Sequence, residues 1–277
     1  MVERNSARNV HREINSTANP LLKLFRHALA EGVTREGWLA IEGPHSLEEA
    51  LTAGPNVTPQ SVLVSETAAN KFQSLLTRLP GGTEVAVVPD GLFSRVAATP
   101  SPQGIAALVE LKTGDLDALL SHHDALFLVA CGVQDPGNLG TMMRSAQALG
   151  ATALLTLKET VSPFNPKATR SSAGAIFHLP IFPGLEAAAL FKQLQGAGVR
   201  IVALDRESPH ALHRADLKGS IAFLIGREGS GLPEGFIRDA DLLLSIPIRP
   251  GMDSVNAATA AGIFLYEAAR QRGFKKM

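Results

Sequence analysis

The fold is decided by the stretch ALFLVACGVQDPGNLGTMMRSAQAL, which occupies residues 125–149. Its first seven residues are all apolar, which predicts a strand buried on both faces. Residues 138–149 then place Leu139, Met142 and Met143 at helical spacing, so a helix follows the strand. A buried strand that leads directly into a helix is typical of a parallel sheet covered by helices. The segment therefore predicts an α/β fold.

The same alternation continues on both sides of this segment. Toward the carboxyl end we predict strands at 152–157, 199–204, 221–225 and 242–247, and helices at 185–195, 233–239 and 254–272. Toward the amino end we predict strands at 38–43, 61–64, 84–88 and 104–111, and helices from Pro20, at 44–53 and at 68–79. Residues 112–124 are polar and charged. We therefore expect a domain over 1–111 that begins with a polar arm (1–19), a linker over 112–124, and a second domain over 125–277.

Composition excludes several classes of protein. The chain has 277 residues, 45% of them apolar and 19% charged, which is incompatible with a disordered or coiled-coil chain. The one cysteine, Cys131, excludes an intramolecular disulfide and a cysteine-based zinc site. The polar start is no secretory signal, and no apolar run approaches the about 18 residues of a membrane helix. We expect a cytoplasmic protein.

The net charge is zero, but the charges are unevenly distributed. Residues 1–35 carry six Lys or Arg against three Glu, and residues 36–130 carry four bases against eleven acids. Residues 131–277 carry sixteen bases against twelve acids. A basic start and a mildly basic second half are compatible with a polyanionic partner, and equally with an ordinary solvated surface.

Three polar or glycine-rich segments follow strands of the second half, where ligands of open α/β sheets bind. The first is Gln134–Gly140, in which we expect Asn138 to cap a helix that carries Arg144. Because Arg144 lies among apolar neighbours in the sequence, its guanidinium must reach a carboxylate, a phosphate or solvent. A capped helix with a surface arginine would explain the same residues.

The second segment, GREGSGLP at residues 226–233, follows the strand at 221–225. Its glycines would let a ligand approach the backbone closely. It matches neither the P-loop pattern nor the GxGxxG pattern, so a dinucleotide fold is poorly supported. A simple glycine-rich turn is the alternative.

The third segment, IPIRPGMDSVN at residues 246–256, leads into the last helix. We expect Ser254 to be the N-cap of that helix and Asn256 to lie in its first turn. Capping needs only one of Asp253, Ser254 and Asn256, so three polar residues together indicate a further role.

Taken together, the order and spacing of these segments resemble the three motifs of the SpoU/TrmH family, RNA ribose 2′-O-methyltransferases of the SPOUT superfamily. The stretch KATRSSAGA (167–175) and Ala203-Leu204-Asp205 match as well. Residues 124–272 carry most of the resemblance. The first 110 residues are similar to the family's small RNA-binding α/β domain, through Asn19-Pro20, Phe25, Glu42-Gly43 and Ser101-Pro102-Gln103-Gly104.

The resemblance implies a parallel sheet with a carboxy-terminal trefoil knot, and a homodimer formed through the knotted domains. It implies S-adenosylmethionine as cofactor, bound by the backbone of Leu204, Gly226, Ile246 and Val255. Val255 replaces the leucine that is usual in the family, a mild departure for a backbone contact. We expect no metal in the reaction.

The resemblance also implies the catalytic residues, which are Arg144, Asn138, Glu228, Ser254 and Asn256. A ribose 2′-OH is a poor nucleophile, so its proton must be removed or the developing oxyanion stabilised. An arginine is an awkward base because its pKa exceeds about 12. We therefore expect Arg144 to pair with an RNA phosphate and stabilise the alkoxide. Asn138, Ser254 and Asn256 would position it, and Glu228 would orient a donor.

We expect RNA contacts from Arg4, Arg8, Arg12 and Arg26. With one Trp and one Tyr, the chain lacks an aromatic platform for stacked bases, so shape and phosphate readout are favoured. The two-domain layout favours ribosomal over transfer RNA. The alternatives are a transfer-RNA 2′-O-methyltransferase, a different nucleotide-binding α/β enzyme and a non-catalytic RNA-binding ribosome assembly factor. A role in resistance to ribosome-targeting antibiotics is a minority interpretation.

Overall fold

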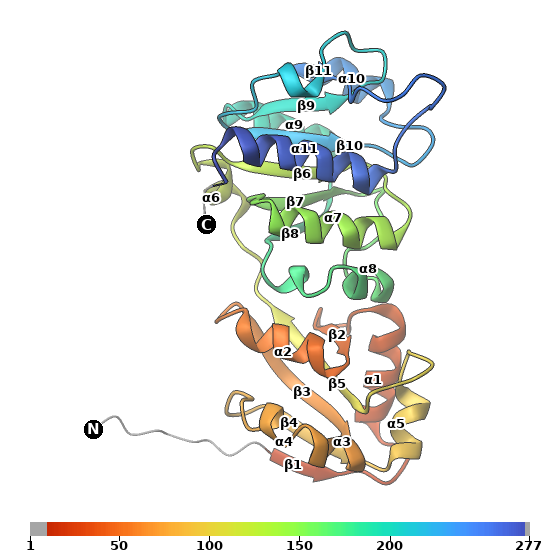
Figure 1. Cartoon of the computed structure of the whole chain (residues 1–277). Helices are drawn as coiled ribbons and strands as arrows, with labels where there is room; N and C mark the ends of the chain where they lie inside the picture. The colour runs from red at the N-terminus through yellow and green to blue at the C-terminus, as the bar shows by residue number, and fades with distance from the viewer. Residues whose placement is uncertain (1–9, 275–277) are drawn as a thin grey trace, which may run out of the picture. The chain divides into compact units, whose positions relative to one another are not determined.

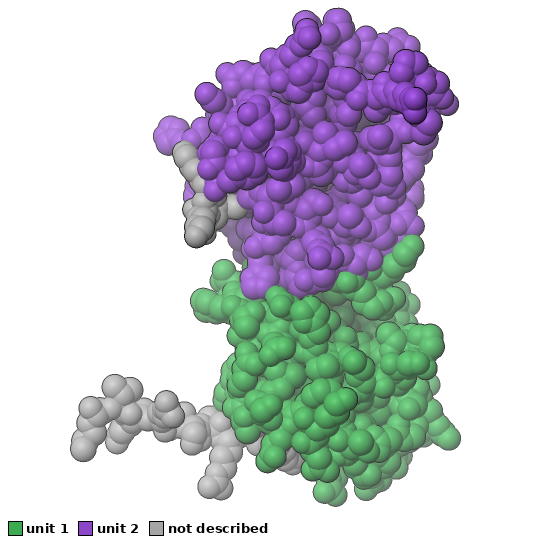
Figure 2. Space-filling model, in the orientation of Figure 1, with its two compact units in different colours: residues 1–112, 164–170 green, residues 113–163, 171–277 purple. Residues whose placement is uncertain are grey.

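The computed structural model of the chain describes residues 10–274, which form two compact units (Figure 2). Unit 1 comprises residues up to Lys112 together with Phe164–Arg170, and unit 2 comprises Thr113–Pro163 and the chain from Ser171. The elements up to residue 112 are β1 (Val10–Glu13), α1 (Pro20–Glu31), β2 (Leu39–Glu42), α2 (Pro44–Thr52), β3 (Val57–Ser65), α3 (Glu66–Lys71), α4 (Gln73–Leu76), β4 (Glu84–Val88), α5 (Asp90–Val96) and β5 (Ile105–Leu111).

Unit 1 contains a mixed five-stranded sheet in the order β1-β4-β3-β5-β2. Strands β1, β3 and β4 run parallel, whereas β5 is antiparallel to both of its neighbours, β3 and β2. The edge strand β1 corrects our prediction that residues 1–19 form only a polar arm. Its four residues have no apolar alternation, so the sequence carries no strand signal there, and pairing with β4 makes the strand.

The remaining elements are α6 (Leu116–Leu120), β6 (Leu126–Ala130), α7 (Pro136–Ala148), β7 (Ala153–Leu157), α8 (Pro166–Ser171), η1 (Ala175–Phe177), β8 (Ile181–Leu185), α9 (Ala187–Gly196), β9 (Arg200–Leu204), η2 (Leu212–Arg214), β10 (Ile221–Ile225), α10 (Glu234–Asp239), β11 (Leu242–Leu244) and α11 (Ala257–Gln271). The six strands of unit 2 form one sheet in the order β11-β9-β10-β6-β7-β8, and every pair is parallel. The predicted parallel sheet is confirmed.

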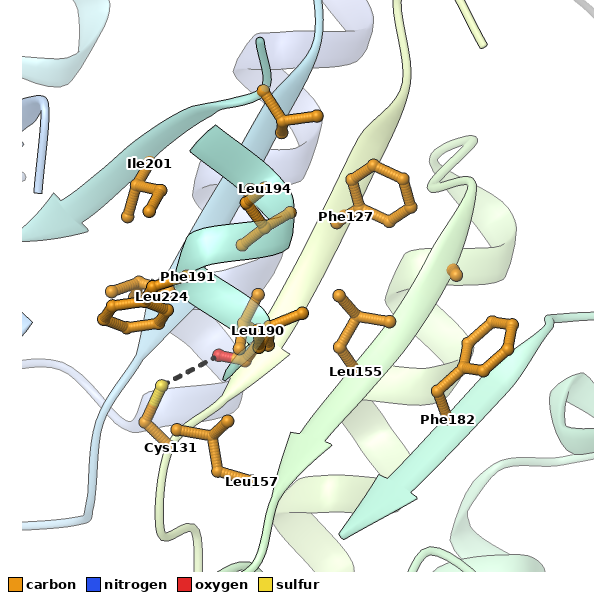
Figure 3. Close-up of a cluster of buried hydrophobic side chains, with 14 of the residues drawn as sticks. Phe127, Cys131, Leu155, Leu157, Phe182, Leu190, Phe191, Leu194, Ile201 and Leu224 are labelled. Atoms are coloured by element: carbon orange, nitrogen blue, oxygen red, sulfur yellow. Dashed lines mark hydrogen bonds between the residues drawn. The ribbon is translucent and has the colours of Figure 1, made fainter. Parts of the chain in front are cut away.

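Helices cover both faces of the parallel sheet, which explains its continuously apolar strands (Figure 1). On one face, α7 and α11 lie over the strands, and the ring of Phe264 stacks on Phe223 with centroids 3.5 Å apart. On the other face, side chains of α9 pack with Phe127, Leu155 and Cys131 (Figure 3). Burial raises the pKa of the Cys131 thiol, so this cysteine is a core residue, as its place in an apolar strand predicts.

Residues 112–124, the predicted linker, contain the short helix α6, and Leu120, only 5% exposed, belongs to the core of unit 2. The sequence also predicts no helix within residues 158–180, where the structure has α8 and η1 ahead of the strand β8. These short elements have few residues from which a period could be recognised.

The position of residues 164–170 depends on Gly32, which ends α1 in the left-handed conformation with φ +98°. A Cβ at this position would lie 1.9 Å from the carbonyl oxygen of Phe164. Only glycine allows this approach, so the end of α1 is shaped to receive the segment. A stretch that is distant in sequence thereby becomes part of unit 1.

Arg272, at the carboxyl end of α11, holds this helix in place through three hydrogen bonds. Its guanidinium donates to the carbonyl oxygens of Leu217 (3.1 Å), Gly219 (2.7 Å) and Asp124 (2.5 Å). Within residues 10–274, no helix is both long and apolar enough to span a bilayer.

We expect Arg272→Ala to lower the free energy of unfolding by about 2–4 kcal/mol, because three carbonyl oxygens lose a charged donor. Urea denaturation monitored by circular dichroism measures the change. Arg238→Ala, which removes an exposed arginine on α10, is the matched control and should change stability by less than about 0.5 kcal/mol. An Arg272→Ala protein as stable as the wild type would show that these hydrogen bonds do not stabilise the fold.

Candidate active site

A cavity of about 430 Å³ opens where β9, β10 and β11 end. We call it the β9–β10 cavity. Parallel strands present their carboxyl ends at one edge of a sheet, so segments far apart in the chain meet there. The cavity is lined by residues of three such segments, namely Leu204–Arg206, Leu224–Leu232, and Leu244, Ile246, Ile248 and Asp253–Val255, with Ile237, Ala257 and Ala260 from α10 and α11. All four predicted cofactor contacts, Leu204, Gly226, Ile246 and Val255, are among them.

The glycine-rich loop closes tightly on itself at the mouth of this cavity. The backbone N–H of Arg227 donates to the carbonyl of Gly231, and the N–H of Gly231 donates to the carbonyl of Arg227, both at 3.0 Å. A Cβ on Gly226 would lie 2.3 Å from the carbonyl carbon of Gly231 and 2.5 Å from the backbone nitrogen of Leu232. The first residue of the loop must therefore be glycine for the backbone to line the cavity.

The lining fits S-adenosylmethionine in its chemistry. Leu204, Ile246 and Val255 provide apolar contacts for a heterocyclic ring. Asp205 and Asp253, the latter paired with Arg206, place two carboxylates on the same cavity, where their remaining lone pairs can accept from hydroxyl and ammonium groups. Such a lining suits a ligand that combines an apolar ring, a sugar and a positive charge.

A chain of hydrogen bonds joins the three predicted motifs beside the cavity. The side-chain amide of Asn256 donates to the Oδ1 of Asn138 at 2.9 Å, and the amide of Asn138 donates to the Oε1 of Glu228 at 2.8 Å. The backbone N–H of Gln134 donates to the other Glu228 oxygen at 3.3 Å. Residues from the loop after β6, the loop after β10 and the start of α11 thus form one polar network.

The helix caps differ from our predictions and explain why this network exists. Asp135, not Asn138, caps α7, and its side chain accepts from the N–H of Asn138 at 2.8 Å. Asn256, not Ser254, caps α11, and its Oδ1 accepts from the N–H groups of Ala258 and Thr259. Because Asp135 takes the capping role, the amide of Asn138 is left for Glu228. Ser254 instead lines the β9–β10 cavity.

Glu228 is held as a carboxylate. Partial burial raises its pKa, but hydrogen bonds from Asn138 and from the backbone N–H groups of residues 228, 134 and 135 outweigh this effect. The net pKa lies below the ordinary value of 4.5. Glu228 is therefore ionised at neutral pH and serves as an acceptor that orients the amide of Asn138.

We expect Glu228→Gln to lower kcat without changing the shape of the pH–rate profile between about pH 6 and 8, because Glu228 does not titrate there. The folded pKa lies below the unfolded one, so the carboxylate stabilises the fold above about pH 4.5 and this contribution is lost as the pH falls. Melting temperatures of both proteins should therefore differ at pH 7 and converge in acid. An acid limb near neutrality that disappears in the variant would instead identify Glu228 as a base.

Arg144 does not line the β9–β10 cavity of its own chain. It lies on α7 with an exposed side chain and makes no hydrogen bond or ion pair within residues 10–274. Its guanidinium therefore faces solvent, one of the three outcomes that its apolar neighbours predict. In a single chain, the structure brings together Asn138, Glu228 and Asn256 but not Arg144.

The predicted RNA contacts lie on unit 1 where the structure describes them. Arg12 is in β1, 3.9 Å from Glu84, with 56% of its side chain exposed. Arg26 is exposed on α1, on the same face as Lys23. Arg4 and Arg8 lie outside the described residues.

Sequence reasoning missed two contributors to the site, Gln134 and Arg206. Gln134 holds Glu228 through its backbone, and Arg206 donates to Asp253 at 3.0 Å across the β9–β10 cavity. The sequence offered one indication of their role, which is that both lie within or next to the motifs. Backbone donors and pairs between separate loops have no sequence pattern of their own.

Comparison with known proteins agrees with this geometry. The profile of the SpoU rRNA Methylase family matches residues 125–266, and that of the MRM3-like substrate binding domain matches residues 33–107. The 23S rRNA (guanosine-2′-O-)-methyltransferase RlmB of Shewanella oneidensis is 33% identical over 84% of this chain and 97% of its own. The 23S rRNA (guanosine(2553)-2′-O)-methyltransferase RlmP of Bacillus subtilis is 30% identical over 92% of this chain and 98% of its own.

Solved structures give the same result. An rRNA methyltransferase from Sinorhizobium meliloti superposes with a TM-score of 0.81 at 27% identity, over 94% of this chain and 98% of that one. The same protein has also been solved with AdoMet bound, at 28% identity and the same TM-score and coverage. With its motifs gathered at one sheet edge, and with relatives of at least 30% identity along most of its length, the chain belongs to the SpoU rRNA methylase family.

Proposed function

We propose that this chain transfers a methyl group from S-adenosylmethionine to a ribose 2′-OH of ribosomal RNA. The observation that carries the proposal is the convergence of three loops on the β9–β10 cavity, with the Asn256–Asn138–Glu228 chain beside it. A cavity for a donor next to a fixed polar network is the arrangement that a two-substrate transfer needs. Relatives named as 23S rRNA methyltransferases support ribosomal RNA as the substrate.

When bound, S-adenosylmethionine supplies an electrophilic methyl group on a sulfonium. Leu204, Gly226, Ile246 and Val255 are proposed to hold the cofactor through their backbones in the β9–β10 cavity. We also propose that the chain of unit 2 forms a trefoil knot, which the matching SpoU family supports.

The hydroxyl nucleophile needs stabilisation of its developing negative charge. Arg144 is proposed to supply it, pairing at the same time with an RNA phosphate. Asn138 and Asn256 are fixed by hydrogen bonds to Glu228 and to the start of α11, so they can position the ribose. Ser254, on the wall of the cavity, is proposed to contact the same ribose.

A homodimer would complete this site. A groove of about 480 Å³ runs between α7 and α11, and Asn138 and Asn256 lie on its wall with Ile263 and Tyr266. Ile263 and Tyr266 are 39% and 53% exposed, unusual for large apolar side chains. A second copy packed on this face would bring its own Arg144 toward the network. This arrangement would explain why Arg144 has no hydrogen-bond or ion-pair partner among residues 10–274 of its own chain.

Unit 1 is proposed to bind the RNA, as a domain over residues 1–111 supplemented by residues 164–170. The matched substrate-binding profile and the exposed bases Arg12 and Arg26 support this role. Relatives named for guanosine support guanosine as the methylated nucleoside. Because ribosomal RNA is the substrate, we place the reaction in the cytoplasm.

We expect Arg12→Ala combined with Arg26→Ala to weaken RNA binding and to lower the slope of log K against log salt by about 1–2, one per lost phosphate contact. Fluorescence anisotropy at several salt concentrations gives the slope. Arg78→Ala, which removes an exposed arginine paired with Glu48, is the control within the same unit. An unchanged slope would place the phosphate contacts elsewhere.

The function itself is tested by mapping 2′-O-methylation of ribosomal and transfer RNA in cells with and without the gene. One ribosomal position should lose its methyl group, and the purified protein with S-adenosylmethionine should restore it. Loss at a transfer-RNA position would favour the alternative substrate. No transfer to any RNA would favour an assembly factor, and stabilisation by NAD or ATP instead of S-adenosylhomocysteine would indicate another enzyme.

A further inference from the structure

A second cavity, of about 530 Å³, opens at the carboxyl ends of β6, β7 and β8. We call it the β6–β8 cavity. Its apolar lining, which we call the floor, consists of Leu157, Leu185, Leu232 and Phe236. Its charged lining, which we call the rim, consists of two ion pairs, Arg227 with Glu159 and Lys158 with Glu186. Nothing in the proposed cofactor or catalytic assignments uses this cavity.

The β6–β8 cavity borders the catalytic network. Arg227 and residues 230–232 of the glycine-rich loop line both this cavity and the β9–β10 cavity. The side-chain amide of Gln134 donates to the carbonyl oxygens of Gly132 (3.1 Å) and Glu159 (2.6 Å), while its backbone N–H donates to Glu228. One residue therefore connects the wall of the second cavity to the carboxylate beside the first. Methyl transfer needs donor and acceptor in neighbouring sites, and the two cavities meet that need.

The charged rim is fixed and accessible. Arg227 Nη2 lies 3.0 Å from Glu159 Oε2, with 46% and 75% of the two side chains exposed. Arg227 is seated against Gly132, where a Cβ would lie 2.6 Å from its Nε. Within the described residues the two side chains make no other hydrogen bond, which leaves guanidinium donors and carboxylate acceptors for a ligand.

Guanine matches this pair most completely. Uracil also places an acceptor next to a ring N–H, but only guanine adds an amino donor beside that N–H for the second carboxylate oxygen. Its Watson–Crick edge offers the O6 acceptor next to the N1–H and 2-amino donors, and a guanidinium beside a carboxylate is the complement of that order. Adenine presents the 6-amino donor next to the N1 acceptor and would meet both groups with the wrong polarity. The apolar floor suits the faces of a base that has left its stack.

We propose that the β6–β8 cavity receives the guanine of the target nucleotide, with Arg227 donating to O6 and Glu159 accepting from N1–H and the 2-amino group. This inference rests on the proposed function. It makes Glu159 a residue that determines which base the methyltransferase accepts at the target nucleotide. Glu159 itself does not line the β9–β10 cavity. Its partner Arg227 does, but Arg227 also packs against Gly132, so loss of Glu159 should not affect the cofactor.

The test uses a short transcript around the mapped site, with guanosine or inosine at the target. Inosine keeps O6 and N1–H but lacks the 2-amino group. Wild-type protein should methylate the inosine transcript with a kcat/KM about 10-fold lower, the discrimination expected of a lost base contact. Glu159→Ala should methylate both transcripts at equally reduced rates, and its Kd for S-adenosylhomocysteine by calorimetry should equal that of the wild type.

The matched control is Glu48→Ala, which removes another exposed carboxylate paired with an arginine, at 3.2 Å, and should keep the full discrimination. Discrimination retained by Glu159→Ala, or absent from the wild type, would overturn the base site. So would a weakened Kd for S-adenosylhomocysteine, because Glu159 would then act through the glycine-rich loop. A wild-type protein that methylates no RNA would overturn the proposed function itself, a result distinct from these.

Discussion

Replacing Arg144 by alanine should lower kcat for methyl transfer by about 100- to 1000-fold, the loss that follows removal of a donor to a developing oxyanion. The Kd for S-adenosylhomocysteine should stay unchanged, because Arg144 does not line the β9–β10 cavity. Single-turnover methylation of the mapped RNA and calorimetry measure the two quantities. Arg238→Ala, which removes an exposed arginine on α10 of the same unit, is the control and should keep both. Turnover within a few-fold of the wild type would contradict the role of Arg144.

The same variant tests whether Arg144 acts in the site of a second copy. Arg144→Ala and Asn256→Ala proteins are each expected to keep only a small fraction of the wild-type kcat, since each lacks one important group in every site. If Arg144 crosses to the neighbouring chain, a mixed dimer has one site with both groups and regains activity on mixing. If Arg144 acts within its own chain, the mixture keeps only that small fraction. The exposed position of Arg144 on α7 favours the first result.

Long apolar periods made most of unit 2 predictable from the sequence. The strand over 221–225 is found at its predicted bounds, and the helix predicted over 138–149 is α7, which covers Pro136–Ala148. These elements are specified by local periodicity and by burial on both faces. The short strand β1 and the segment 158–184 carry no such period, and their structure depends on partners distant in the chain.

Part of the predicted site is found together in one chain, but Arg144 is not, and the hydrogen bonds between the site residues were not predicted. The motifs placed Asn138, Glu228 and Asn256 together because sheet topology collects strand ends. The predicted cap of α7 was wrong. Asp135 and Asn138 are both good capping residues, and the choice between them depends on Glu228, which reaches Asn138 from another loop. The pair of Arg227 and Glu159 joins two loops 68 residues apart, a distance over which the sequence gives no signal of contact.

Adding one methyl group at Gly226 should weaken cofactor binding more than the small volume of that group suggests. Gly226→Ala places a Cβ 2.3 Å from the carbonyl carbon of Gly231 and 2.4 Å from its oxygen, and both atoms belong to the backbone. Since no side chain can move aside, the loop must open and break its two hydrogen bonds between Arg227 and Gly231. Overpacking a closely packed site costs about 1–3 kcal/mol. We therefore expect the affinity for S-adenosylhomocysteine to fall about 10- to 100-fold.

Gly235→Ala separates this effect from a general loss of glycine. Gly235 lies in α10 of the same unit, and a Cβ there would meet nothing within 4 Å. Alanine also favours a helix over glycine, so this variant should be at least as stable as the wild type and bind S-adenosylhomocysteine normally. Calorimetry on both variants, with melting temperatures to show that each is folded, gives the comparison. If Gly226→Ala bound as tightly as Gly235→Ala, the glycine-rich loop would not form the wall against which the cofactor rests.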